Sequence, residues 1–157
     1  MRGCEILRVD PESPDEDTIG KAAELIRMGG LVVFPTSSFY GLGTSALSAE
    51  AVNKVFRVKR RDRRNPVLIL IASLAELDPL VRFIPKPATQ LMEAFWPGSL
   101  TLVFLAEKLL PSNLTGDTQK IGIRLASHAV ACSLVRALGS PITGTSANIS
   151  GQGAAVR

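Results

Sequence analysis

The sequence is poor in the residues from which many catalytic and metal centres are built. Its 157 residues include a single histidine, His128, and two cysteines, Cys4 and Cys132. Two distant cysteines suggest neither a disulfide framework nor a thiolate metal site. The histidine has no Ser or Cys motif placed to use it as a base, and carboxylates with metal-ligand spacing do not occur. A hydrolytic triad and a metal ion held by side chains are therefore disfavoured.

Long apolar stretches are also missing. The longest apolar run covers residues 67–72, far below the roughly 20 residues that span a bilayer, and no secretory signal pattern begins the chain. We therefore expect no membrane partner and a cytoplasmic location. A hydrophobic content of 46% over this length suits a single domain around one core.

Neither of the common phosphate-binding loops is present. The pattern G-x-x-x-x-G-K-[ST] does not occur, which argues against an ordinary P-loop fold. Gly41, Gly43 and Ala46 satisfy only the loose form G-x-G-x-x-A. That fingerprint needs a strand that leads straight into the glycines, whereas Pro35 and further residues intervene here. A dinucleotide site of this type is therefore not expected.

Charge is divided unevenly along the chain. Residues 1–50 hold 4 basic and 8 acidic side chains, and residues 51–157 hold 14 basic and 6 acidic ones. Much of the basic excess lies in residues 54–64, which we call the basic run. This concentration of positive charge predicts an anionic partner. Charge alone leaves two interpretations open: a solvated patch that attracts nucleic acid without specificity, or fixed cations that point into a pocket. The basic run contains Lys54, Arg57, Lys59, Arg60, Arg61, Arg63 and Arg64.

Helical and strand-like patterns alternate along the chain. Asp17 or Thr18 is expected to cap the first helix, and Ser127 the last. Consecutive strands between residues 99 and 125 indicate mixed strand directions. We predict an α/β fold, an open twisted mixed sheet with helices on its faces. The predicted helices cover 19–26, 52–56, 87–96 and 127–138, with a short one after Ser73, and the predicted strands cover 31–34, 67–72, 99–106, 121–125 and 141–147.

Two loops of small hydroxyl-bearing residues follow predicted strands, at 35–43 and 143–151. The first belongs to a segment, 36–48, that shows no periodicity and is expected to be irregular. Such loops let backbone N–H groups approach phosphates closely, although each alone is more often a plain turn. Together with the basic run, they favour a pocket for an anionic small molecule, most simply a nucleotide.

Five segments read in order along the chain as PTSSFYGL at 35–42, KRR at 59–61 followed by Asn65-Pro66, WPGSLT at 96–101, Arg124, and TSANISG at 145–151. Together they resemble the YrdC family of L-threonylcarbamoyladenylate synthases. That family carries P-T-x-T-x-Y-G-L, K-x-R, W-P-G-x-L-T, a strand Arg and T-S-A-N-x-S-G. The match extends over nearly the whole chain, and five ordered motifs at compatible spacing are a strong signal.

The resemblance implies a single YrdC-like domain over residues 1–157, apparently lacking the family's C-terminal strand segment. It implies a nucleotidyltransferase that converts L-threonine, bicarbonate and ATP into threonylcarbamoyl-AMP and pyrophosphate, for the t6A modification at position 37 of tRNA. The carboxylated amine attacks the α-phosphorus, so positioning and electrostatics suffice and no catalytic side chain is expected. Mg²⁺ is expected on the phosphates of ATP, largely through water, with no protein ligand set. Other proteins of the t6A pathway are implied as partners.

The resemblance also implies two groups of binding residues. Arg124 suits the threonine carboxylate because a guanidinium can bind both oxygens. The chain departs from the family at Ser38, where Thr is preferred, at Leu70, where many members have His, and at Asp62 and Ala126, where Pro is usual. The residues implied for ATP are Lys59, Arg61, Asn65, Ser146 and Asn148. Those implied for L-threonine are Thr36, Ser38, Arg124 and the backbone near Gly144, with Tyr40 shaping the loop.

Two other functions fit parts of the pattern. A non-catalytic relative would bind double-stranded RNA or tRNA through the basic run, with a steep salt dependence. A carbamoyl-transfer module of hydrogenase-maturation proteins shares the fold, but those proteins normally carry zinc-finger-like cysteine pairs and an acylphosphatase region, which this sequence lacks. The synthase interpretation requires that the basic run and the Ser/Asn turn near the end of the chain converge around one polyphosphate.

Overall fold

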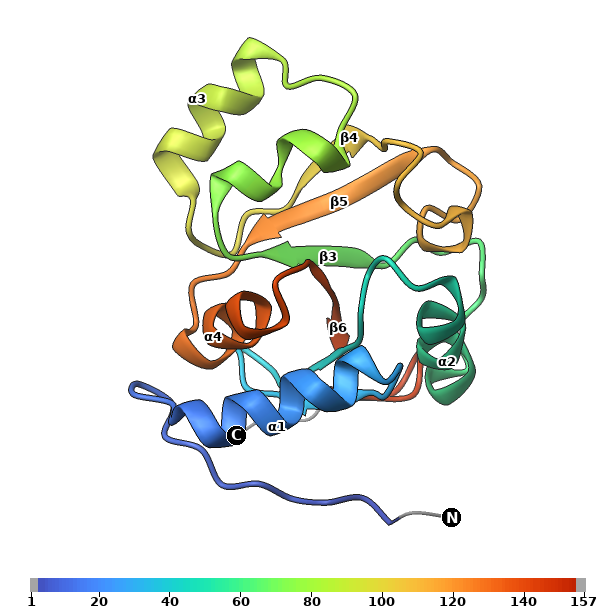
Figure 1. The fold of residues 1–157 in the computed structure, drawn as a ribbon. Coiled ribbons are helices and arrows are strands. Elements are labelled where there is room, and N and C mark those ends of the chain that lie inside the picture. Colours follow the sequence, from blue (N-terminus) through green and yellow to red (C-terminus); the bar gives the residue numbers. More distant parts are fainter. Residues whose placement is uncertain (1–2, 155–157) are drawn as a thin grey trace.

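A mixed β-sheet organises the chain in the computed structural model, which describes residues 3–154 (Figure 1). Its six described strands lie in the order β1-β2-β6-β3-β5-β4, so β1 and β4 form the two edges. The β3–β5 pair is parallel, and the other four pairs of neighbouring strands in that order are antiparallel. The predicted open mixed sheet is confirmed. The strands are β1 (Val32–Phe34), β2 (Gly41–Gly43), β3 (Leu68–Ile71), β4 (Leu102–Leu105), β5 (Lys120–Leu125) and β6 (Ile142–Ser146).

Helices cover the two faces of this sheet. On one side α1 (Glu16–Arg27) packs against α4 (Ala129–Leu138). On the other lie α2 (Ala49–Lys59), α3 (Lys86–Phe95) and the short 3₁₀ turns, whose apolar residues join one cluster with β3, β4 and β5. No helix within residues 3–154 is long and apolar enough to cross a membrane. The 3₁₀ turns are Leu74–Glu76, Asp78–Leu80 and Ser112–Leu114.

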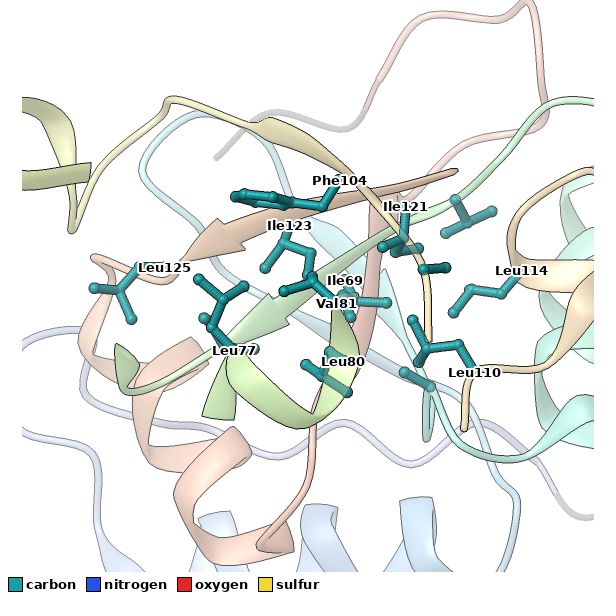
Figure 2. Packing of buried hydrophobic residues seen from close by; sticks show 14 of the residues in the cluster. Ile69, Leu77, Leu80, Val81, Phe104, Leu110, Leu114, Ile121, Ile123 and Leu125 are labelled. Carbon is teal, nitrogen blue, oxygen red and sulfur yellow. The ribbon is translucent and has the colours of Figure 1, made fainter. Parts of the chain in front are cut away.

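Strand alternation explains why β3 is buried on both faces. Ile69 and Ile71 belong to the cluster that Figure 2 shows, whereas Leu70 packs with α1 and α4. The continuous apolar run at 67–72 predicted this double burial. On β5, Ile121 and Ile123 face the first cluster, so the alternate residues Lys120, Gly122 and Arg124 turn to the opposite face.

Two predicted helix N-caps were wrong. The N-cap of α1 is Asp15, whose carboxylate accepts from the backbone N–H of Thr18 at 2.8 Å, rather than Asp17 or Thr18. The N-cap of α4 is His128 rather than Ser127, because Nδ1 of His128 accepts from the N–H of Val130 at 3.2 Å. Imidazole is an uncommon cap, so the sequence rule favoured the serine.

The segment 36–48, predicted to be irregular, contains the strand β2. Its Gly-Leu-Gly sequence has no apolar alternation, so the strand depends on its neighbours β1 and β6. A Cβ on Gly43 would lie 2.6 Å from the carbonyl oxygen of Thr143. Glycine is therefore required here because two strand backbones approach closely. From composition alone, a glycine of this kind cannot be told apart from a glycine in a turn.

Candidate functional site

A cavity of about 600 Å³ opens on the sheet face opposite the cluster of Figure 2. Its floor is formed by Leu68 of β3, Gly122 of β5 and Gly144 of β6. The two glycines keep this floor low, because a Cβ on Gly144 would lie 2.9 Å from Cδ1 of Leu68, and one on Gly122 would lie 3.1 Å from Cγ2 of Thr101. We call this space the larger cavity.

The lining of the larger cavity has a single sign of charge. Arg61 and Lys120 contribute cations, and Thr118, Thr145 and Ser146 contribute hydroxyl-bearing side chains. Among the described residues, no carboxylate lines it. An apolar floor with cations and hydroxyls around it suits a ligand that has both a flat apolar part and an anionic part.

Arg61 is held at the cavity by the chain that follows α2. The helix ends where Arg60 adopts a left-handed conformation (φ 50°). The guanidinium of Arg61 donates from Nε to the carbonyl of Asn65 at 3.1 Å and from Nη2 to the carbonyl of Pro66 at 2.8 Å. These two bonds fix the orientation of the guanidinium before any ligand arrives.

Lys59 connects the end of α2 to the turn after β6. Its side chain is only 2% exposed, and Nζ donates to the carbonyls of Ser146 and Asn148 and to Oδ1 of Asn148. Burial lowers the pKa of Lys59, and the nearby charge of Arg61 lowers it further. The basic run and the Ser/Asn turn therefore do converge, as the synthase interpretation requires.

A smaller cavity of about 40 Å³ is lined by Thr36, Leu70 and Arg124, among others. The guanidinium of Arg124 is partly buried, and burial lowers its pKa. None of the ion pairs found in residues 3–154 includes Arg124; its Nε and Nη2 donate instead to Oγ1 of Thr101. The charge of Arg124 thus remains uncompensated in this part of the protein.

The family model described as "Telomere recombination" (Sua5_yciO_yrdC) matches residues 24–157. The chain belongs to the Sua5/YciO/YrdC family. A threonylcarbamoyl-AMP synthase of Pyrococcus abyssi is 42% identical over 141 residues, which cover 90% of this chain and 42% of that protein. One of Bacillus subtilis is 38% identical over 144 residues, which cover 91% and 42%. The chain thus spans about two fifths of the length of these relatives.

A solved structure of a family member has the same fold as this chain. The crystal structure of P. abyssi Sua5 complexed with L-threonine superposes with a TM-score of 0.89 at 41% identity, over 92% of this chain and 42% of that one. The resemblance to the YrdC family drawn from the five motifs is confirmed, and so is the fold that it implied.

Four of the five residues expected to bind ATP lie together. Arg61 and Ser146 line the larger cavity, Asn148 belongs to the turn that follows Ser146, and Lys59 donates to that turn. The three N–H donors of the Lys59 ammonium are all directed at this turn. Asn65 is exposed and contributes its carbonyl to Arg61 rather than a side chain to the lining.

The residues expected to bind L-threonine are less closely grouped. Thr36 and Arg124 line the smaller cavity, whereas Gly144 lines the larger one. Ser38 is exposed and outside both linings, although its backbone N–H donates to Oγ1 of Thr36 at 3.3 Å. Leu70, at the position where many family members have His, forms an apolar wall beside Arg124.

Sequence reasoning missed Thr101, Thr118 and Lys120. Thr101 closes the WPGSLT motif, which we interpreted as a helix end and strand start alone. Lys120 precedes the buried Ile121, so the alternation of β5 could have placed it on the same face as Gly122. Thr118 lies in a turn without a pattern that marks it.

Proposed function

We propose that this chain is the synthase domain of a threonylcarbamoyl-AMP synthase, which forms threonylcarbamoyl-AMP and pyrophosphate from L-threonine, bicarbonate and ATP. One observation carries the proposal: two cavities on the same sheet face each present a fixed guanidinium, Arg61 in the larger and Arg124 in the smaller. The names of the P. abyssi and B. subtilis relatives support it.

ATP is proposed to occupy the larger cavity. Arg61 would bind the polyphosphate, and the hydroxyl of Ser146, which donates to Oδ1 of Asn148 in this structure, would turn to donate to it as well. The bare floor around Leu68 and Gly144 would accept the flat base or the ribose. Lys59 and Asn148 would hold the turn that carries Ser146 rather than contact the phosphates through free donors. Asn65 would act on the phosphates through its hold on Arg61.

L-threonine is proposed to bind through Arg124. A guanidinium can bind both carboxylate oxygens, and the smaller cavity offers the hydroxyl-bearing Thr36 and the backbone of the 36–38 turn beside it. The complex of P. abyssi Sua5 with L-threonine supports an amino-acid site in this fold. Ser38 would complete the site when the amino acid is bound.

The reaction needs little from the protein beyond binding. The threonine amine and bicarbonate form a carbamate with loss of water, and a carbamate oxygen attacks the α-phosphorus of ATP while pyrophosphate leaves. No protein nucleophile enters these steps, so the contribution expected of the chain is alignment of the two substrates and cations near the crowded negative charge.

Magnesium is proposed to arrive with ATP. Among the described residues, no group of three or more His, Cys, Asp or Glu side chains could hold a metal ion. The residues present fit an ion bound to phosphate oxygens and water, with hydroxyls such as that of Ser146 nearby, because Mg²⁺ retains several waters in such sites.

The same proposal covers the wider assignment. The chain would be a nucleotidyltransferase that acts in the cytoplasm with other t6A-pathway proteins and supplies the carbamoyl group for position 37 of tRNA.

The decisive experiment is incubation of the protein with L-threonine, bicarbonate and ATP. We expect pyrophosphate release that depends on threonine, together with a product of the mass of threonylcarbamoyl-AMP. L-Alanine serves as the matched amino-acid control. Release that is equal with and without threonine, or absent, would contradict the proposal.

A second candidate function is RNA binding. Arg57, Arg60 and Arg63 of the basic run are exposed and outside the lining of the larger cavity. Duplex RNA or tRNA binding through them would weaken steeply with salt and would be indifferent to threonine and ATP. Filter-binding titrations at two salt concentrations, with and without ATP, distinguish this function from the first.

A further inference from the structure

We propose that Thr101 is the positioning residue that orients the guanidinium of Arg124 for the carboxylate of the amino-acid substrate. The role in binding rests on the proposed function, whereas the orientation of Arg124 by Thr101 can be tested without it.

The hydrogen bonds between the two side chains use one edge of the guanidinium. Nε of Arg124 donates to Oγ1 of Thr101 at 3.0 Å, and Nη2 donates to the same oxygen at 2.8 Å. A guanidinium has five N–H donors in a rigid fork. With the Nε–Nη2 edge held by Thr101, the Nη1–Nη2 edge keeps a donor on each nitrogen, which is the pair that a carboxylate binds bidentately.

The sheet register brings Thr101 to this place. Leu102 pairs with Ile123, and Val103 pairs with Gly122, so one further step of the antiparallel ladder sets Thr101 opposite Arg124. The chain before Thr101 is anchored as well: the N–H of Gly98 donates to the carbonyl of Leu125 at 3.3 Å.

Gly122 confines the Thr101 side chain. A Cβ on Gly122 would lie 3.1 Å from Cγ2 of Thr101, so the threonine methyl lies directly over the glycine. A β-branched side chain has few χ1 rotamers, and contact of its methyl with the sheet floor restricts it further. The hydroxyl is therefore held in the direction of Arg124.

A neutral acceptor suits this task better than a carboxylate. Asp or Glu at this position would form an ion pair with Arg124 and compete with the substrate carboxylate. None of the ion pairs in the part of the chain described here involves Arg124. The hydroxyl of Thr101 orients the guanidinium and leaves its positive charge available.

Thr101 also connects the two cavities. Its methyl lies over Gly122, which lines the larger cavity, and its hydroxyl holds Arg124, which lines the smaller one. An amino acid bound to Arg124 would therefore lie beside the space proposed for ATP. The position of the carboxylate then determines how the amine meets the nucleotide.

Steady-state kinetics of two variants test the role in binding. Thr101→Val removes the acceptor but keeps the branched shape, and Thr101→Ser keeps the acceptor but removes the methyl. We expect Thr101→Val to raise KM for L-threonine by about tenfold, the order expected for loss of a hydrogen bond to a charged group. KM for ATP should change by less than about twofold, and Thr101→Ser, which keeps the acceptor but loses the methyl that confines it, should lie between the wild type and Thr101→Val. Equal changes in both KM values, or a Ser variant as impaired as the Val variant, would show a merely structural role.

An NMR measurement on the ligand-free protein tests the orientation itself. The Nε–Hε signal of Arg124, assigned by its disappearance in Arg124→Lys, should exchange slowly with water in the wild type and in Thr101→Ser. In Thr101→Val we expect fast exchange, with the backbone amide spectrum otherwise preserved. An unchanged Hε signal in Thr101→Val would overturn the inference. If the wild type binds no threonine but Hε depends on Thr101, the proposed function fails while the orientation of Arg124 stands.

Discussion

The ammonium of Lys59 donates a hydrogen bond to Oδ1 of Asn148 at 3.1 Å, although 89 positions separate the two residues in the chain. The same ammonium donates to the Asn148 carbonyl at 2.8 Å and to the carbonyl of Ser146. A buried charge is costly unless its donors are satisfied. Three acceptors from one turn meet that requirement, so Lys59 and the turn stabilise each other.

Lys59→Met should therefore lower stability as well as ATP affinity. The variant keeps the length of the side chain but leaves the carbonyls of Ser146 and Asn148 without their donor. We expect the free energy of unfolding in urea to fall by about 1–3 kcal/mol, the cost of an unsatisfied buried polar group. Lys21→Met, at an exposed position of α1, is the control and should change it little. Equal effects of the two variants would contradict a special role of Lys59.

Arg61→Ala should weaken ATP binding without a comparable loss of stability. The guanidinium lines the larger cavity and is held by two backbone carbonyls. Loss of hydrogen bonds to a charged ligand predicts a decrease of about 1.5–3 kcal/mol in the binding free energy of ATP, measured by calorimetry. Arg63→Ala removes an exposed charge of the same run and is the matched control. If ATP affinity is unchanged while RNA affinity falls, the RNA function is favoured.

The carboxyl of Asp62 should titrate well below its ordinary range. The side-chain hydrogen bonds from Arg64 and the Arg64 backbone N–H lower the pKa of Asp62 from 3.8 to about 2. Below pH 3.8 the unfolded chain then binds more protons at this residue than the folded one. The stabilising contribution is therefore complete above about pH 3.8 and is lost as the pH falls towards 2.

Carboxyl NMR titration checks this value directly. Arg64→Gln should return the pKa of Asp62 towards its ordinary value, and Arg63→Gln should leave it at about 2. A low pKa that persists in Arg64→Gln would mean that the Arg64 side chain is not its main cause.

Gly43→Ala should lower the stability of the protein, because the added methyl group has no room in the packed interior. The added Cβ would lie 2.6 Å from the carbonyl oxygen of Thr143 and 2.8 Å from Cε1 of Phe34. Backbone cannot shift as easily as a flexible side chain, so we expect a loss of about 1–3 kcal/mol in the free energy of unfolding.

Gly20→Ala should have the opposite effect and raise the stability of the protein. Gly20 lies inside α1, and nothing lies within 4 Å of an added Cβ. We expect a gain of about 0.5–1 kcal/mol, because alanine has the higher helix propensity. Loss of stability in both variants would indicate that packing around Gly43 is not the cause.

Local sequence patterns predicted correctly those helices and strands whose conformation depends mainly on neighbouring residues in the chain. The run 67–72 was predicted as a strand buried on both faces, and the last helix was predicted to end at residue 138, where it does end because Gly139 adopts a left-handed conformation (φ 74°). The strand β2 was missed because its Gly-Leu-Gly sequence becomes a strand only by pairing with β1 and β6. Thr101 was missed because the register of β4 and β5, rather than its own motif, directs it towards Arg124.

The sequence by itself determined the family and the alternation of helices and strands, since these follow from residue types at short spacings and from the order of five motifs. Only the tertiary structure decided that the candidate residues divide between two cavities, that Lys59 is directed at a turn, and that Arg124 has a hydroxyl for a partner. The physical reason is that a contact between residues far apart in the chain depends on strand register and on the space left by glycines, and neither is encoded at any one position.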